Sequence, residues 1–347
     1  MPALYITEPG ATVLLAGESL HVTARPAKGK NSKEVSLLEV ALHRLELIGL
    51  VGRIHMTAPA LEECLDHGID VAYFRANGQF RARLVPAVPR SGDLRLFQSC
   101  AFHDANRRLQ RARHVADAKV GNAVQVLIGV QSNRPNSPVL STAIAELKEF
   151  RHLVRRAATL ESLLGLEGAS ARSYFAGFQH GFKSEIDFPG RRRRPPPDPA
   201  NALLSFGYVL LSNLLAGMIE ARGLDPALGF YHEPRPGRPS LALDLLEEFR
   251  HPLVDRFVLR LCNLRILRHE HFEADDTKNA GGVRLTRDGL KLFFFHWEKH
   301  LLTQLRDAEG GNPIAVRPLL IRQIERLVAD FRGKEAYRAF QFGEADG

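Results

Sequence analysis

The spacing of apolar residues changes near Leu94, and this change constrains the fold more than any other feature of the chain. Before it, short apolar runs such as residues 3–7 and 12–15 alternate with Pro and Gly, a pattern typical of short strands. After it, apolar residues follow the period of an amphipathic helix. The sequence therefore predicts an α+β protein, with a small N-terminal β-rich domain over residues 1–93 and a larger, mainly α-helical domain over residues 94–347.

One hairpin can be placed within the β-rich part. Residues 70–75 and 79–84 read as two strands, and Asn77-Gly78 lies between them. Asn-Gly tolerates the positive φ angles that tight hairpin turns need. A short helix is expected just before this hairpin, over residues 58–67.

The helical part contains six predicted helices, over residues 97–130, 141–164, 200–222, 241–268, 287–305 and 317–331. Asp198 followed by Pro199 is the arrangement preferred at a helix start. The longest apolar run, residues 208–219, is too short to cross a bilayer and is expected to be a buried helix. No membrane association is therefore predicted.

The charge of the chain favours a polyanionic partner. Lys and Arg number 47 against 39 Asp and Glu, which leaves a formal net charge of +8. Such an excess points to nucleic acid, and the alternative is a basic surface that serves only solubility.

The cysteines and the N-terminus bear on the cellular compartment. Cys64, Cys100 and Cys262 lie far apart and form no C-x-x-C pair, so we expect packed thiols rather than disulfides or zinc ligands. The chain begins without the basic and apolar regions of a secretory signal, which predicts a cytoplasmic location.

Glu167 is the residue most informative about chemistry. In a helix it would share one face with Leu163, Tyr174 and Phe178, so a carboxylate would lie within an apolar stripe. Burying an unpaired carboxylate is costly, and such a residue needs a basic partner, a raised pKa or a metal ion. A structural ion pair remains the alternative to a metal ligand.

A second cluster begins with His232 in a Gly- and Pro-rich loop. The helix after this loop carries an acidic stripe opposite an apolar one, made of Asp244, Glu247, Glu248, His251 and Asp255. Such a stripe is most often a solvated face. Together with Glu167, however, His232 and Glu247 offer two carboxylates and an imidazole, a mixture that suits Mg²⁺ or Mn²⁺, and Asp244 is a possible further ligand.

Arginines cluster in two loops. One loop contains the run of four consecutive arginines Arg191, Arg192, Arg193 and Arg194, and the loop that carries His232 contains Arg235 and Arg238. We expect arginines from these loops, or from the helices near Arg107 and Arg111, to contact DNA phosphates. Solvated loops without a DNA role are the alternative.

Segments of the chain resemble, in the same order, the CRISPR-associated protein one (Cas-one) family. They are LYITEPG at 4–10, IDVAYF at 69–74 with Gly78, GLEGASARSYF at 165–175, RPPPDPANALLSFGY at 194–208, GFYH at 229–232 and SLALDLLEEFR at 240–250. The resemblance implies an N-terminal β domain for dimerisation and partner contacts, and a C-terminal helical catalytic domain. It also implies a homodimer that binds DNA and assembles with the family's small partner, Cas-two, into a hetero-hexamer.

The family's metal ligands carry over residue by residue. A glutamate, a histidine and a second acid correspond to Glu167, His232 and Glu247, although Asp244 could share or replace the role of Glu247. The implied activity is that of a metal-dependent DNA endonuclease and integrase, a hydrolase of phosphodiester bonds that joins 3′-hydroxyl ends of prespacer DNA to the CRISPR repeat by transesterification during spacer acquisition in antiviral defence. The competing hypothesis is a basic nucleic-acid-binding scaffold without catalysis.

Overall fold

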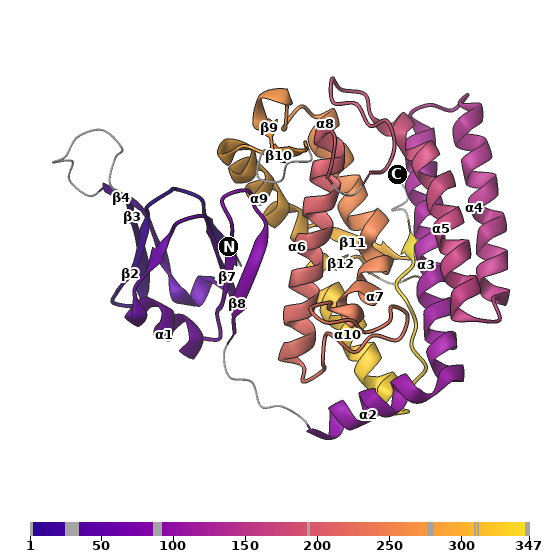
Figure 1. Cartoon of the computed structure of the whole chain (residues 1–347), viewed down its shortest axis with the longest axis horizontal. Coiled ribbons are helices and arrows are strands. Elements are labelled where there is room, and N and C mark those ends of the chain that lie inside the picture. The colour runs from indigo at the N-terminus through magenta and orange to yellow at the C-terminus, as the bar shows by residue number, and fades with distance from the viewer. Residues whose placement is uncertain are drawn as a thin grey trace. The chain divides into compact units, whose positions relative to one another are not determined.

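The structure, a computed structural model, describes residues 3–343 except 25–34, 86–91, 193–194, 276–280, 309 and 311. Its contacts divide the chain into two compact units. Unit 1 comprises Met1–Val88 and Glu270–Lys299, and unit 2 comprises Pro89–His269 and His300–Gly347. Figure 1 shows a strand-rich unit 1 and a helical unit 2, the α+β organisation that the sequence predicts.

Unit 1 is built on two four-stranded sheets. The first has the order β1-β5-β7-β8 and the second the order β4-β3-β2-β6. Their strands are β1 (Ala3–Ile6), β2 (Thr12–Ala16), β3 (Ser19–Ala24), β4 (Val35–Ala41), β5 (Leu47–Val51), β6 (His55–Met56), β7 (Asp70–Phe74) and β8 (Phe80–Leu84). The helix α1 (Ala58–Asp66) contacts β2 and β7. The predicted hairpin is confirmed as the antiparallel pair β7–β8, and Gly78 in its turn has a φ of 78°.

A segment from the C-terminal half of the sequence also belongs to unit 1. It contains β9 (Phe272–Ala274), β10 (Val283–Leu285) and most of α9 (Arg287–Leu301). The ring of Phe294 on α9 stacks on Tyr5 of β1 with 3.9 Å between ring centroids. A single boundary between residues 93 and 94 does not describe this grouping, because residues 270–299 pack with the N-terminal strands.

Unit 2 is mainly helical. Its helices are α2 (Gly92–His103), α3 (Ala105–Ser132), α4 (Pro138–Arg156), α5 (Leu160–Phe178), α6 (Pro199–Ala221), α7 (Ser240–Phe249), a π-helical turn (Arg250–Asp255), α8 (Arg256–Asn263) and α10 (Val316–Phe331). A small sheet joins β11 (Gln304–Asp307), β12 (Ile314–Ala315) and β13 (Phe342–Gly343). The long helix α3 packs against α4, α5 and α7 (Figure 1).

Two of the predicted helices are divided at a polar capping residue, and a third changes its hydrogen-bonding pattern. Asp104 separates α2 from α3, and its carboxylate accepts a hydrogen bond from the amide of Arg107. Thr159 caps α5 in the same way, so the predicted helix 141–164 is two helices. The predicted helix 241–268 changes to a π-helical turn after Phe249. Such caps satisfy amides that a helix end leaves without partners.

The start of α6 is as predicted, because the Asp198 carboxylate accepts from the amide of Asn201 at 2.8 Å with Pro199 in the first turn. By length and composition α6 is apolar enough to cross a membrane, but 61% of its apolar window is buried. The core helix of a soluble protein meets the same criterion, so α6 is weak evidence for a membrane span. Its packing agrees with the buried helix predicted from the sequence.

The cysteines divide into two kinds. Cys64 and Cys262 are buried free thiols, as predicted, and burial raises the pKa of each. The expectation was wrong for Cys100, whose side chain is exposed because α2 turns it toward solvent.

Candidate active site

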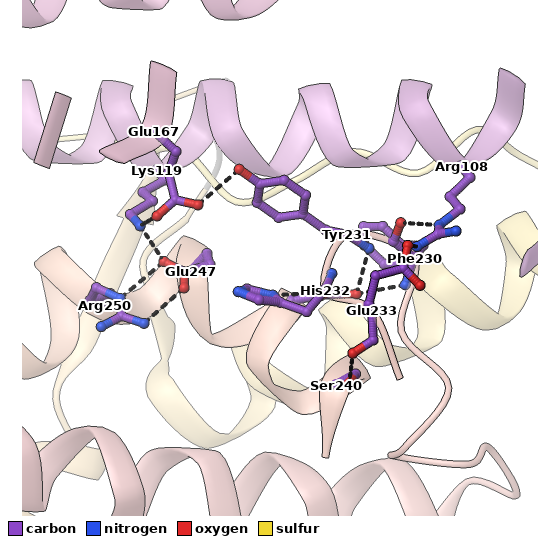
Figure 2. A network of polar contacts seen from close by, with 11 residues as sticks. Arg108, Lys119, Glu167, Phe230, Tyr231, His232, Glu233, Ser240, Glu247 and Arg250 are labelled. Atoms are coloured by element: carbon purple, nitrogen blue, oxygen red, sulfur yellow. Dashed lines mark hydrogen bonds and ion pairs between the residues drawn. The ribbon is translucent and has the colours of Figure 1, made fainter. Parts of the chain in front are cut away.

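Acidic and basic side chains from three helices of unit 2 meet in one buried network (Figure 2). Lys119 lies on α3, Glu167 on α5 and Glu247 on α7. Because α3 packs against both α5 and α7, the Lys119 side chain can reach both glutamates. His232 joins the network from the loop between α6 and α7. The structure thus brings Glu167, His232 and Glu247 into one region, although 80 positions separate the first from the last.

The ammonium group of Lys119 links the two glutamates. It forms an ion pair with Oε1 of Glu167 and another, at 2.6 Å, with Oε2 of Glu247. The Lys119 and Glu247 side chains are only 5% and 3% exposed. One buried cation therefore lies between two carboxylates from different helices, as Figure 2 shows.

Glu247 is held by a second cation as well. Arg250, three residues further along the chain, donates from its guanidinium to both carboxylate oxygens, at 3.0 and 2.8 Å. This guanidinium also lies over the ring of Tyr208, 4.4 Å from its centroid. Burial alone would raise the pKa of Glu247, but the charges of Arg250 and Lys119 hold it well below the ordinary value. Glu247 is therefore ionised at neutral pH.

Glu167 is ionised for a similar reason. Its Oε2 accepts a hydrogen bond from the hydroxyl of Tyr231 at 2.8 Å, and its Oε1 faces Lys119. Burial raises the pKa of Glu167, and Lys119 and the Tyr231 hydroxyl more than offset that effect. Of the three forms of compensation expected for Glu167, which are a basic partner, a raised pKa or a metal ion, the structure shows a basic partner, Lys119.

Asp244 fixes the loop that contains His232. Its carboxylate accepts from the backbone amides of Phe230, Tyr231 and His232, at 2.7, 3.0 and 2.8 Å. A side chain at Gly229 could not fit there, since a Cβ atom would lie 2.7 Å from Oδ2 of Asp244. Asp244 is fully buried, and its oxygens are occupied by the loop. This geometry gives Asp244 a structural role, whereas a share in metal binding stays a prediction.

The same carboxylate orients the imidazole of His232. Nδ1 of His232 lies 2.7 Å from Oδ1 of Asp244, which leaves Nε2 as the ring nitrogen for a ligand. Figure 2 shows the ring on the side of the network where Glu247 lies. Burial lowers the pKa of His232, but the hydrogen bond and charge of Asp244, aided by Glu247, raise it above the ordinary value. A metal-binding histidine commonly has its other ring nitrogen fixed by a carboxylate in this way.

The donor chemistry fits a hard divalent cation. Among the described residues, no three His, Cys, Asp or Glu side chains are placed closely enough to hold a metal ion together. However, Glu167 and Glu247 already share one cation, the ammonium group of Lys119, with the imidazole of His232 nearby. Two carboxylates and an imidazole are ligands that Mg²⁺ and Mn²⁺ accept.

The acidic stripe predicted on α7 is not a solvated face. Glu248 is fully buried and accepts from the Tyr337 hydroxyl, from Phe340 N at 2.7 Å and from Gln323 Nε2 at 2.9 Å. Burial raises the pKa of Glu248 to about 7 despite these hydrogen bonds. Glu248 therefore anchors the C-terminal segment. The solvated-face reading was wrong because both faces of α7 pack inside unit 2.

The last acid of the stripe also has a structural environment. Asp255 is fully buried and accepts from the hydroxyls of Tyr174 and Tyr208. Its Oδ2 lies 2.7 Å from Nδ1 of His251. Tyr208 connects Asp255 to Arg250, whose guanidinium stacks on the Tyr208 ring.

The arginines expected to bind DNA have different environments. Arg191 is occupied within the protein, since it donates to Asn201 and Ser205 at 2.8 and 3.0 Å. Arg111 is buried in an ion pair with Asp330, so its expected place along a DNA groove was wrong. Arg192 and Arg235 are exposed, Arg107 is exposed beside Asp104, and Arg238 is half-buried. Arg193 and Arg194 lie outside the described residues.

Lys119, Tyr231 and Arg250 were not identified from the sequence. Lys119 lies within the apolar stretch 115–127 of α3, so the reasoning applied to Glu167 could have found it. Arg250 follows Glu247 at a spacing of three residues, which is also the spacing of ion pairs on a helix. Tyr231 gave no such signal, because its contact with Glu167 joins segments distant in the sequence.

The fold and this network define a class: an α+β protein with a carboxylate and histidine centre in its helical unit. The chain belongs to the Cas1 family, because the family model described as CRISPR associated protein Cas1 matches residues 4–299. It is 34% identical to the CRISPR-associated endonuclease Cas1 3 of Thermus thermophilus, over 95% of this chain and 94% of that protein. It is 33% identical to a Cas4 exonuclease/Cas1 endonuclease fusion of Geobacter sulfurreducens, over 95% of this chain but only 58% of the fusion.

Solved structures agree with the fold. A casposase bound to integration product superposes with a TM-score of 0.82 at 23% identity, covering 100% of this chain and 95% of that one. A CAS1 protein from Thermotoga maritima superposes with a TM-score of 0.77 at 23% identity, covering 100% of both chains. The mixed architecture of a strand-rich N-terminal part and a larger helical part is therefore that of Cas1 structures.

Proposed function

We propose that this chain is a metal-dependent DNA endonuclease and integrase that joins the 3′-hydroxyl ends of prespacer DNA to the CRISPR repeat by transesterification. The observation that carries the proposal is the pair Glu167 and Glu247, two ionised carboxylates on one buried cation beside His232. Family membership supports the activity, since the relative from Thermus thermophilus is named an endonuclease. The casposase bound to integration product supports the fold of an integrase.

In this proposal Glu167, His232 and Glu247 hold Mg²⁺ or Mn²⁺, which when bound polarises a phosphate oxygen of the DNA. Each protein residue then has a separate task. Asp244 fixes the imidazole so that Nε2 is available, and Arg250 fixes the Glu247 carboxylate through two hydrogen bonds. Such preorganisation lowers the cost of reaching the transition state. The prespacer 3′-hydroxyl attacks a phosphorus of the repeat and loses its proton as the new P–O bond forms. The P–O bond within the repeat strand breaks, and its oxygen leaves and takes up a proton.

The proposed partners are DNA, a second copy of the chain and Cas2, joined in a hetero-hexamer. Support for Cas2 comes from a structure titled Cas6-RT-Cas1--Cas2 complex, which superposes with a TM-score of 0.78 at 22% identity. We also propose a cytoplasmic location. DNA would be bound mainly through its backbone, by exposed arginines such as Arg192 and Arg235.

An integration assay tests the proposal against the scaffold hypothesis. Purified protein, Cas2, prespacer DNA and a supercoiled plasmid carrying the array are incubated with Mg²⁺ or Mn²⁺. We expect joined products that disappear with EDTA and with His232→Ala but persist with His152→Ala, a matched change at an exposed histidine on α4. Joining that is unaffected by EDTA would contradict the metal requirement. DNA binding without cleavage or joining in any metal would favour the scaffold.

DNA binding should depend steeply on salt. If about six phosphates are neutralised, affinity should fall roughly 10³-fold between about 50 and 200 mM salt, because bound counterions are released. Fluorescence anisotropy with a labelled duplex measures this slope, and Arg192→Ala with Arg235→Ala should make it shallower. Affinity that changes less than about threefold over this range would contradict backbone binding.

A further inference from the structure

Lys119 is an unusual member of the network because it is a buried cation at the centre of the proposed metal site. Its ammonium group contacts Glu167 and Glu247, and the side chain is 5% exposed. Without a cation between them, the buried carboxylate of Glu247 and the partly buried carboxylate of Glu167 would repel each other and lack compensation. Lys119 supplies that compensation.

The two cations on Glu247 are held differently. Arg250 makes two parallel hydrogen bonds to the carboxylate and stacks on Tyr208, so its guanidinium is fixed on several sides. Lys119 offers a compact charge at the end of a flexible chain of four carbons, without a planar fork. Of the two, Lys119 is therefore the cation that can leave the carboxylate while the network around it remains.

A divalent ion held by Glu167 and Glu247 would need the carboxylate oxygens that the ammonium group now contacts. Two cations cannot share that position, since like charges a few ångströms apart repel strongly in a buried site. When a metal ion binds, the Lys119 ammonium group must therefore leave at least one of the two carboxylates.

We propose that Lys119 is an internal competitor for the metal, which neutralises Glu167 and Glu247 until a divalent ion displaces its ammonium group. The inference rests on the proposed metal centre. It makes Lys119 a residue that sets metal affinity and keeps the two glutamates in place before metal arrives. It also gives a reason for a lysine among the carboxylates of the proposed metal site, where a neutral side chain would leave more room for an ion.

A purely structural salt bridge makes the opposite prediction. If Lys119 only keeps Glu167 and Glu247 correctly placed, its removal disorders both ligands and weakens metal binding. If Lys119 competes with the metal, its removal strengthens metal binding. The direction of the change in affinity therefore separates the two roles, and it does so without reference to catalytic activity.

The experiment is a calorimetric titration of Mn²⁺ into the full chain after treatment with chelator. We expect Lys119→Met to bind Mn²⁺ at least about tenfold more tightly than the original protein, because a buried positive charge is gone. In EDTA this variant should melt about 5–10 °C lower, and saturating Mn²⁺ should restore most of that loss. If Lys119→Met does not fold in EDTA, Lys119→Gln, which can still donate to one carboxylate, replaces it.

Arg111→Met is the matched control. Arg111 lies on the same helix and is also a buried cation, but its partner is Asp330. This variant should melt at a lower temperature with an unchanged affinity for Mn²⁺. Unchanged or weaker Mn²⁺ binding by Lys119→Met beside normal binding by the original protein would overturn the competitor role alone. Failure of the original protein and every variant to bind Mn²⁺ would overturn the metal centre as well.

Discussion

Glu247→Gln is expected to lower metal-dependent cleavage and joining of DNA by about 10²–10³-fold while the protein remains folded. Glutamine keeps the size of the side chain and an oxygen that can accept from Arg250, but it removes the negative charge of a proposed metal ligand. The loss should therefore appear in the rate of the chemical step rather than in DNA affinity.

The choice of glutamine follows from the structure. From the sequence, Glu247→Ala is expected to abolish integration with folding largely intact. Glu247 proves to be buried between Arg250 and Lys119, so alanine would leave Arg250 without its carboxylate and Lys119 with only one of its two. Removing one partner of a buried pair costs about 3–5 kcal/mol, and activity lost in Glu247→Ala could then reflect unfolding.

Glu248→Gln provides the control for this experiment. Glu248 is the neighbouring buried acid, and it accepts hydrogen bonds from Tyr337, Phe340 and Gln323 rather than contacting Lys119 or Arg250. The oxygen of a glutamine there can still accept from Phe340 N, and its amide can donate to the Tyr337 hydroxyl. Rates of plasmid integration and melting temperatures are measured for both variants in Mg²⁺ and in Mn²⁺. Activity close to that of the original protein in Glu247→Gln would remove Glu247 from the proposed ligands.

Asp244→Ala is expected to lower the free energy of unfolding by about 3–5 kcal/mol and to lose activity together with stability. Its carboxylate accepts from three consecutive backbone amides and from the ring of His232. Alanine would leave these buried donors without an acceptor and would free the loop that positions the imidazole. Asp244→Asn, which keeps one oxygen, should be intermediate.

Denaturant unfolding and integration rates of these two variants provide the measurement. The expected pattern is a parallel loss of stability and rate from asparagine to alanine, most severe in Asp244→Ala. An Asp244→Ala protein that unfolds like the original but does not integrate, beside an active Glu247→Gln, would show that the metal ligand lies one helical turn earlier on α7.

From the sequence it could be predicted which part of the chain forms strands and which part forms helices. The change in apolar period near Leu94 correctly separates strands from helices, because side-chain periodicity reflects which face is buried. The assignment of residues 270–299 to unit 1 could not be predicted. It depends on contacts such as the stacking of Phe294 on Tyr5, and a helix with an apolar face gives no indication of its partner.

In the site, too, residues could be recognised from their own helix, whereas partners distant in the sequence could not be predicted. Glu167 could be recognised because a carboxylate within an apolar stripe demands compensation. The roles of Asp244 and Glu248 could not be assigned, because both accept hydrogen bonds from segments elsewhere in the chain. A carboxylate on a helix looks the same in sequence whether it binds a loop or an ion.

The most direct test of the central claim is an anomalous difference map from a crystal of the protein soaked in Mn²⁺. The claim is that Glu167, His232 and Glu247 together hold the ion at which DNA is cut and joined. We predict one strong peak about 2.0–2.5 Å from a carboxylate oxygen of each glutamate and from Nε2 of His232. The Lys119 ammonium group should then have moved off at least one carboxylate. A peak elsewhere in the protein, or intact Lys119 contacts with no peak between the glutamates, would contradict the claim.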